Sequence, residues 1–301
     1  MTLPFPPEPV VPSEQRASGD VDVRYEDICQ DGRLTLLGMP HAYGGILFRD
    51  VLDAHPVTTR ARETGILPIL SRLLLEGTSE VVSVNRRLSV RGAYELTRTR
   101  GETPRLFLNL WAEIHGPREL TMGLPLDAQG ELRMAGRVFA EHTFTRPFGP
   151  PAERRVSSLD PLGLPMPETI YEPGEPAALL ALPPGATWLD EHEVLDPAPI
   201  AFSLSHTDSN QHVNSLVYPA LFDEAACRRF VAHGRSAAVL ARRLEIAYRK
   251  PCFAGDRARV ALRAFTLGGQ LGAVGRFVAE ADVGDLQAAR PHCYVTALFS
   301  P

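Results

Sequence analysis

The sequence predicts an α+β fold made of two similar halves, each with one helix followed by several antiparallel strands. Alternating apolar and polar residues, typical of half-buried strands, run through 106–114 and 257–263. A helix-like apolar stretch precedes each group of strands, at about 45–54 and 216–232. The chain therefore reads as a tandem repeat.

Two pairs of segments support the repeat. Residues 86–90 (Arg-Arg-Leu-Ser-Val) resemble 242–246 (Arg-Arg-Leu-Glu-Ile), and we align them as the start of the strands in each half. Residues 138–147 and 293–301 have the matching pattern of a last strand. Gly268 and Gly269 mark a turn between two late strands.

Proline marks the boundary between the halves. Twelve of the 27 prolines lie between Pro147 and Ile200, where they exclude a central strand or a long helix. A connector of this length is expected to lie along the surface. The predicted organisation is a flexible arm over 1–20, a first domain over 21–147, a Pro-rich connector over 148–199 and a second domain over 200–301.

Composition excludes several classes of protein. The net charge of −5 and the isoelectric point near 6.0 give no general basis for binding nucleic acid or a membrane surface. No stretch approaches 18 apolar residues, and the four cysteines form no Cys-x-x-Cys pair, so we predict a cytoplasmic protein with free thiols. No Gly-rich phosphate loop or metal-ligand spacing is present, and no metal or other cofactor is predicted.

The polar segment 205–218 is the most informative part of the chain. Asp208, Asn210, His212 and Asn214 occupy alternate positions, and an extended segment would direct all four side chains to one side. The predicted helix follows at once, and its first backbone N–H groups lack intrahelical partners. Polar groups at this point can cap the helix, or hold a carbonyl oxygen beside an activated water; the residues alone leave both open.

The tract from Asp208 to Asn214 (Asp-Ser-Asn-Gln-His-Val-Asn) resembles the Asp-x-Asn-x-His-Val-Asn signature of the hotdog-fold acyl thioesterases, in particular those acting on acyl-acyl-carrier-protein. Ser215 stands where that family has a second Asn. The resemblance covers about 199–265. It implies a double hotdog, in which each of two tandem antiparallel sheets wraps around a long helix.

A second family motif, Glu-Tyr-Arg-Arg-Glu-Cys-Gly, is matched in part by residues 247–252 (Ala-Tyr-Arg-Lys-Pro-Cys). Cys252 is kept, but Pro251 replaces the catalytic Glu of the family. One acid–base partner is therefore missing or supplied elsewhere, with Glu224 and Glu245 as candidates.

The resemblance implies a catalytic role for Asp208, Asn210, His212 and Cys252. Asp208 would be the general base or the nucleophile of an anhydride route. Asn210 would orient the carbonyl or the water, and His212 would relay a proton or donate a hydrogen bond. Backbone amides of 214–217 would stabilise the oxyanion.

Other residues near the motif are expected to bind substrate, namely Asn214, Tyr218, Arg249 and Lys250. Tyr218 is also expected to pack in the core. Arg249 and Lys250 would belong to a basic cluster for the phosphates of coenzyme A or for an acidic carrier protein, together with Arg228, Arg229, Arg242 and Arg243. The composition offers a simpler explanation, because Lys250 is the only lysine beside 30 arginines.

In the first half, His41 and Tyr43 precede the predicted helix and are assigned to substrate binding at a degenerate site. Residues 39–45 also resemble the double-hotdog acyltransferase/decarboxylase of the leinamycin polyketide pathway, in which a tyrosine carries the acyl group. That resemblance would make Tyr43 a nucleophile.

The predicted function is hydrolysis of an acyl-CoA or acyl-carrier-protein thioester in fatty-acid or polyketide metabolism, by an enzyme that can form homo-oligomers through its sheets. One alternative is an acyltransferase/decarboxylase or dehydratase of polyketide biosynthesis. Another is a non-catalytic protein that binds acyl thioesters, which the replacement of Glu by Pro251 would favour.

Overall fold

The computed structural model describes residues 5–123 and 125–301. They form two compact units, 5–173 and 174–301. Strand pairing within each unit is antiparallel and the helices are few, in agreement with the predicted α+β class. In the described part of the chain, no helix is both long and apolar enough to cross a membrane.

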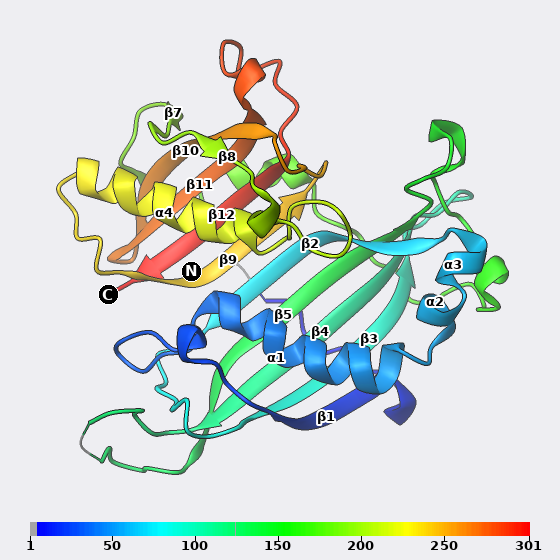
Figure 1. Cartoon of the computed structure of the whole chain (residues 1–301), viewed down its shortest axis with the longest axis horizontal. Coiled ribbons are helices and arrows are strands. Elements are labelled where there is room, and N and C mark those ends of the chain that lie inside the picture. The colour runs from blue at the N-terminus through cyan, green and yellow to red at the C-terminus, as the bar shows by residue number, and fades with distance from the viewer. Residues whose placement is uncertain (1–4, 124) are drawn as a thin grey trace. The chain divides into compact units, whose positions relative to one another are not determined.

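The sheet of the N-terminal unit has the strand order β1-β3-β4-β5-β2, and helix α1 lies across one of its faces (Figure 1). Helix α1 spans Met39–Ile46 and continues as a π-helix over Leu47–Leu52; the short helices α2 (Pro56–Thr59) and α3 (Ala61–Thr64) follow. The strands are β1 Arg16–Val21, β2 Leu67–Gly77, β3 Leu88–Arg98, β4 Leu106–Pro117 and β5 Leu132–Thr145.

The sheet of the C-terminal unit has the order β9-β12-β11-β10, and three short strands pair with the outer edge of β10. Helix α4, Val217–Ala232, lies across one face of this sheet (Figure 1). The strands are β6 Thr187–Trp188, β7 Val194–Leu195, β8 Ile200–Ala201, β9 Leu240–Tyr248, β10 Arg257–Leu267, β11 Gln270–Ala279 and β12 Cys293–Ser300.

Helix–sheet packing relies on glycine in both units. The side-chain position of Gly136 in β5 is occupied by the end of Met39 from α1. At Gly275 in β11, the ring of Phe222 from α4 lies 2.8 Å from the place that a Cβ would take. Both Met39 and Phe222 are fully buried. A methyl group at either glycine would clash, so these positions allow each helix to approach its sheet closely.

The predicted helix at 216–232 and the strand segments 106–114 and 257–263 are confirmed as α4, β4 and β10. The turn at Gly268 and Gly269 is also present, and both residues have positive φ angles, 56° and 85°, that favour glycine.

Two details of the predicted repeat are wrong. Helix α1 begins at Met39 rather than near Gly45, with Pro40 in its first turn, where a missing N–H costs nothing. Residues 86–90 and 242–246 are not equivalent, because the latter lie in β9, the first strand after α4, whereas β3 is the second strand after α1. The alignment failed because β2 (Leu-Pro-Ile-Leu-Ser-Arg-Leu-Leu-Leu-Glu-Gly) lacks regular alternation of apolar and polar residues, and we did not recognise it as a strand.

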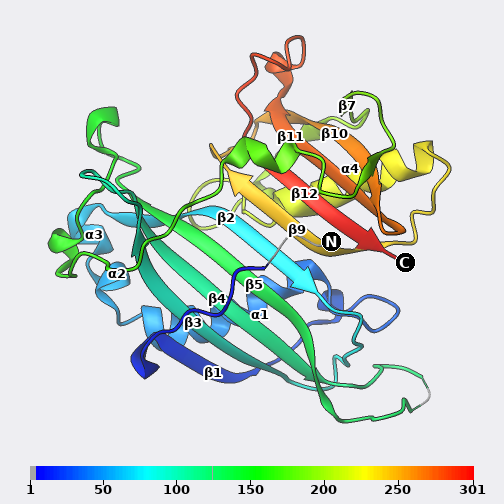
Figure 2. The same ribbon diagram turned by 180° about the vertical axis from the view of Figure 1, so that it is seen from behind.

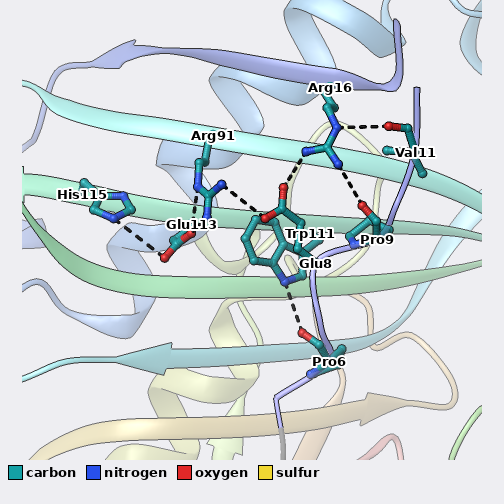
Figure 3. A network of polar contacts seen from close by, with 9 residues as sticks. All are labelled: Pro6, Glu8, Pro9, Val11, Arg16, Arg91, Trp111, Glu113 and His115. Atoms are coloured by element: carbon teal, nitrogen blue, oxygen red, sulfur yellow. Dashed lines mark hydrogen bonds and ion pairs between the residues drawn. The ribbon is translucent and has the colours of Figure 1, made fainter. Parts of the chain in front are cut away.

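The flexible arm was predicted over 1–20; residues 1–4 lie outside the described residues, and residues 5–20 do not form such an arm. Strand β1 pairs with β3, and the segment before it lies on the sheet (Figure 3). The Arg16 guanidinium donates to Glu8 at 2.6 Å, and Glu8 also lies 3.3 Å from Arg91. Trp111 donates its indole N–H to the Pro6 carbonyl at 3.2 Å. Prolines lack the N–H groups of a strand ladder, so side chains from the sheet hold this segment instead.

The Pro-rich region 148–199 is divided between the units at residue 173 rather than forming one connector. Its last part belongs to the C-terminal unit, where Asp196 accepts two hydrogen bonds from Arg228 of α4, at 3.0 and 2.7 Å. Asp190 accepts hydrogen bonds from Arg229 at 2.8 Å and from His233 at 2.7 Å. Arg228 and Arg229, which we assigned to a substrate-binding cluster, therefore neutralise buried carboxylates that fasten the C-terminal half of α4.

Candidate active site

The motif segment is a compact loop, and the extended conformation that we predicted is wrong. Thr207 and Val213 form an isolated antiparallel bridge across it. The Asp208 N–H donates to the His212 carbonyl at 3.2 Å, and the Gln211 N–H donates to the Asp208 carbonyl at 3.0 Å. Gln211 at the tip has φ 65°, in the left-handed region. Asp, Ser and Asn favour such turns because their short side chains bond to nearby backbone groups.

The loop orients the Asp208 carboxylate with two hydrogen bonds. One oxygen accepts the Asn210 N–H at 2.8 Å, and the other accepts the side-chain amide of Asn214 at 3.1 Å. The residue is partly exposed, and each oxygen keeps capacity for a further hydrogen bond. A fixed, accessible carboxylate therefore lies in the loop that precedes α4.

Asn214 links this carboxylate to the helix. Its side-chain oxygen accepts the Leu216 N–H at 2.9 Å, and its carbonyl accepts the Val217 N–H at 3.1 Å. Its own N–H donates to the His206 carbonyl at 2.8 Å. Because these polar atoms all have protein partners, the geometry favours a positioning role for Asn214 over the substrate contact that we expected.

These contacts narrow the choice of oxyanion donor. The amides of Asn214, Leu216 and Val217 are already used. Among the residues that the structure describes, none accepts a hydrogen bond from the amides of Ser215 and Tyr218. The Ser215 N–H shares its peptide group with the Asn214 carbonyl, and the Val217 N–H that donates to this carbonyl at 3.1 Å fixes the peptide. The Ser215 N–H is thus a free, oriented donor beside the Asp208 loop.

Asn210 and His212 have side chains available for a ligand. Asn210 is exposed, and its side-chain amide contacts no described residue through a hydrogen bond. His212 Nδ1 lies 3.1 Å from the Val213 carbonyl oxygen. A carbonyl only accepts, so Nδ1 donates in this contact, and Nε2 is the ring nitrogen left for a ligand.

Cys252 lies directly beside the loop but is fully buried. Its carbonyl accepts the Val213 N–H at 2.8 Å, and its N–H donates to the Tyr218 hydroxyl at 3.0 Å. Its Sγ lies 3.1 Å from Nδ1 of His292, a residue that sequence reasoning missed. Burial raises the pKa of the Cys252 thiol to about 11 and lowers the pKa of His292, so both groups are neutral near pH 7.

Residues 210–282 match the family model described as Thioesterase superfamily. No curated protein sequence matches the chain. A solved structure of a Lactobacillus plantarum protein assigned as an oleoyl thioesterase is 12% identical, covers 94% of this chain and 95% of its own, and has a TM-score of 0.63. A Bacteroides thetaiotaomicron acyl-ACP thioesterase is 16% identical, and the match covers 96% of this chain and 100% of that one with a TM-score of 0.57. A 12:0-ACP thioesterase from Umbellularia californica is 10% identical, and the match covers 95% of this chain and 94% of that one with a TM-score of 0.60.

The resemblance to the hotdog-fold thioesterases is confirmed. At these identities the three structures establish the fold, and they match it over nearly the whole chain. In the part of this hotdog chain that the structure describes, no three His, Cys, Asp or Glu side chains are grouped as a metal site requires.

Alkylation will test whether Cys252 is a reactive thiolate of the candidate site. We expect iodoacetamide at pH 8 to leave Cys252 unmodified in the native protein and to modify it only after unfolding, because the thiol is buried and protonated. Peptide mass spectrometry measures the rate at each cysteine, with the partly exposed Cys29 as the internal control. Alkylation of native Cys252 faster than Cys29 would contradict this expectation.

The other predicted site residues of the C-terminal unit divide into a buried and an exposed group. Tyr218 is 3% exposed and packs against Phe202, Tyr248 and Phe277, so it is a core residue. Its hydroxyl accepts the Cys252 N–H. Arg249 and Lys250 are exposed, and their backbone amides both donate to the His292 carbonyl. Their side chains remain candidates for binding an anionic substrate.

His41 and Tyr43 lie within α1 of the N-terminal unit, not before it as we predicted. His41 is exposed, whereas Tyr43 is 7% exposed and burial raises the pKa of its hydroxyl far above the ordinary value. No described residue accepts or donates a hydrogen bond at the Tyr43 hydroxyl. A buried phenol without a base is a poor nucleophile, which weighs against acyl transfer through Tyr43.

Asp223 on α4 gives a stability prediction. Burial, and next the charge of Glu224, raise the pKa of this carboxyl to about 6, and it has no ion-pair partner in the described part of the chain. A raised carboxyl pKa means that the folded state loses stability as the pH rises through 6. Asp223→Asn is therefore expected to raise the urea midpoint at pH 8 and to have little effect at pH 4. An equal effect at both pH values would contradict the shifted pKa.

Proposed function

We propose that this chain is an acyl thioesterase that hydrolyses acyl-CoA or acyl-carrier-protein thioesters in fatty-acid or polyketide metabolism, and that its site lies in the loop before α4. The observation that carries the proposal is the Asp208 carboxylate, oriented by Asn214 next to the unused Ser215 N–H. The Thioesterase superfamily match over residues 210–282 supports it, as do the names of the three similar structures.

The tandem double hotdog forms part of this proposal. Each unit places one helix across a sheet in which the first strand after the helix lies at one edge and the last strand lies next to it. The order β2-β5-β4-β3 of one unit then corresponds to β9-β12-β11-β10 of the other. This correspondence supports a repeat in which the C-terminal unit carries the Asp-x-Asn-x-His loop and the N-terminal unit has a degenerate one.

Hydrolysis through this loop can be written with balanced steps. A water held by Asp208 adds to the thioester carbonyl carbon, and its proton passes to the carboxylate. The carbonyl oxygen becomes an oxyanion that the Ser215 N–H stabilises. When the carbon–sulfur bond breaks, the proton returns to the thiolate, and free acid and free thiol leave. The anhydride route, with Asp208 as the nucleophile, gives the same products.

Asn210 and His212 are proposed to orient the substrate. The unpaired Asn210 amide can donate to the carbonyl or accept from the water. Nε2 of His212 can accept a proton or a hydrogen bond. Cys252 is assigned to positioning instead of covalent catalysis, because its carbonyl holds Val213 and its thiol is neutral. Pro251 leaves Asp208 as the carboxylate on which the proposed hydrolysis depends.

The test is release of free thiol from a panel of acyl-CoA and acyl-carrier-protein thioesters, followed with a thiol-reactive dye. Wild type is compared with Asp208→Asn and Tyr43→Phe. We expect turnover that is lost with Asp208 and kept in the Tyr43 variant. Absence of thiol release from every substrate, or acyl groups found on Tyr43 by mass spectrometry, would refute the thioesterase proposal.

A further inference from the structure

Three arginines surround a cavity of about 250 Å³ in the N-terminal unit. The lining includes Arg105, Arg154 and Arg155 together with Thr143 and Thr145. The remaining lining side chains, Phe144 and Val156, are buried and apolar. Nothing in the proposed hydrolysis uses this cavity.

Backbone pairing builds the cavity from separate segments. Strand β4 pairs with β5, as the view from behind shows (Figure 2). Arg105 immediately precedes β4, and the end of β5 supplies both threonines. Beyond β5 the chain turns back, so that Arg155 forms an isolated bridge with Thr145. The Thr145 hydroxyl donates to the Arg154 carbonyl at 2.8 Å. The three arginines therefore line one cavity because of the sheet and the turn that follows it.

Few of the guanidinium donors are used. The Arg105 guanidinium makes no hydrogen bond to a described residue; its Cζ lies 5.1 Å from the centroid of the Phe107 ring. Arg154 donates through Nε to the Gly149 carbonyl at 3.1 Å, and Arg155 donates through one Nη to the Thr103 carbonyl. Most N–H groups of the three side chains remain available.

These arginines also have no ion-pair partner among the residues that the structure describes. Other arginines of the same unit are paired with carboxylates, as Arg118 is with Glu80 at 2.6 Å. Three like charges around one cavity repel one another, and the chain as a whole is acidic. An anion with several oxygens would remove this repulsion and accept from the unused donors.

We propose that this cavity binds a phosphate group of the thioester substrate. Guanidinium groups bind phosphate with charge-assisted and often bidentate hydrogen bonds. The hydroxyls of Thr143 and Thr145 already donate to Ser71 and to the Arg154 carbonyl, so the arginines supply the donors. The identity of the ligand rests on the proposed function: both substrate forms carry phosphate, as the 3′-phosphate and diphosphate of coenzyme A or as the phosphodiester of a carrier protein's phosphopantetheine arm.

Binding is tested by titration calorimetry of the full chain with coenzyme A, 3′-dephospho-coenzyme A and a holo-acyl-carrier protein. The variants are Arg105→Gln, which removes no hydrogen bond to a described residue, and the triple Arg→Gln variant. Arg100→Gln is the matched control, an exposed arginine of the same unit that lies 3.8 Å from Glu172. We expect Arg105→Gln to weaken binding by about 10- to 100-fold, as loss of charge-assisted hydrogen bonds does.

The pattern of losses identifies the source of the phosphate. If Arg105→Gln loses affinity for coenzyme A but not for its dephospho form, the cavity binds the 3′-phosphate. Equal losses of affinity for both indicate the diphosphate. A loss confined to the carrier protein indicates the phosphodiester. Unchanged affinity of Arg105→Gln for all three ligands would overturn the proposal, as would an equal loss with Arg100→Gln.

A kinetic measurement separates this inference from the proposed function. An acyl-N-acetylcysteamine thioester carries no phosphate, so Arg105→Gln is expected to leave its hydrolysis unchanged while raising KM for the phosphate-bearing substrate. If KM is unchanged for every substrate, the phosphate proposal fails although the thioesterase proposal stands. If nothing is hydrolysed, the thioesterase proposal fails and calorimetry still tests the cavity.

Discussion

Replacing Asp208 by asparagine is expected to lower kcat about 100- to 10,000-fold, the range for loss of a general base. The asparagine keeps an oxygen for the Asn210 N–H but loses the acceptor for the Asn214 amide. Stability should fall by only about 1 kcal/mol, the cost of one hydrogen bond. Thiol release measures the rate, and urea unfolding measures the stability.

A swapped pair provides the control for Asp208. In the double variant Asp208→Asn, Asn214→Asp, the amide of residue 208 donates to the carboxylate of residue 214, and the other oxygen of residue 214 still accepts the Leu216 N–H. The loop keeps every hydrogen bond of its side chains, but the carboxylate has moved. We expect restored stability without restored turnover. Recovery of turnover in the double variant would show that the hydrogen bond, not the position of the carboxylate, governs catalysis.

Asp190→Ala is expected to destabilise the protein by about 3 kcal/mol, because it removes one partner from a buried charged cluster. The Asp190 side chain is 1% exposed, and it accepts from Arg229, His233 and the Ala264 N–H. Its loss leaves two basic groups and one backbone donor without their acceptor. Urea unfolding is the measurement, and Glu191→Ala is the control at the adjacent exposed carboxylate.

The loss of folding stability caused by Asp190→Ala should depend on pH. Burial alone would raise the pKa of this carboxyl, but the hydrogen bonds from Arg229, the Ala264 N–H and His233 prevail and lower it below the ordinary 3.8. A lowered pKa stabilises the fold above the ordinary value, and this stability is lost as the pH falls through the folded pKa. The difference between wild type and Asp190→Ala should therefore shrink below about pH 4. A difference that grows on acidification would contradict this assignment.

The sequence predicted those elements that have a clear period. Helix α4 and strands β4 and β10 were found because their apolar residues recur at helix or strand spacing, although residues 106–112 of β4 are buried on both faces. Strand β2 was missed because its leucines do not alternate with polar residues. The N-terminal segment was misjudged for a different reason, because its prolines suggest an unstructured chain. It is held in place by Trp111, which is far away in the sequence, and by Arg16, which belongs to no recognisable motif.

The candidate site was predicted in composition but not in conformation. The alternate spacing predicted that Asp208 and Asn214 lie on one side of an extended segment. They are in contact because the loop turns back on itself, not because the segment is extended. His292 was beyond reach, since it contacts Cys252 across 40 residues of sequence. That contact depends on the pairing of β9 with β12, which places Cys293 opposite Tyr248. Such partners follow from the register of a sheet and have no local signal.

The carboxylates that fasten α4 determine where this chain can be shortened. A truncated C-terminal half that starts at residue 200, the boundary suggested by proline content, would lack Asp190 and Asp196. Arg228 and Arg229 would then lose their partners, and the outer edge of β10 would lose β6 and β7. A truncation that starts at residue 174 retains all of these groups. The segment that looks like a dispensable tether in the sequence is thus an integral part of the half that follows it.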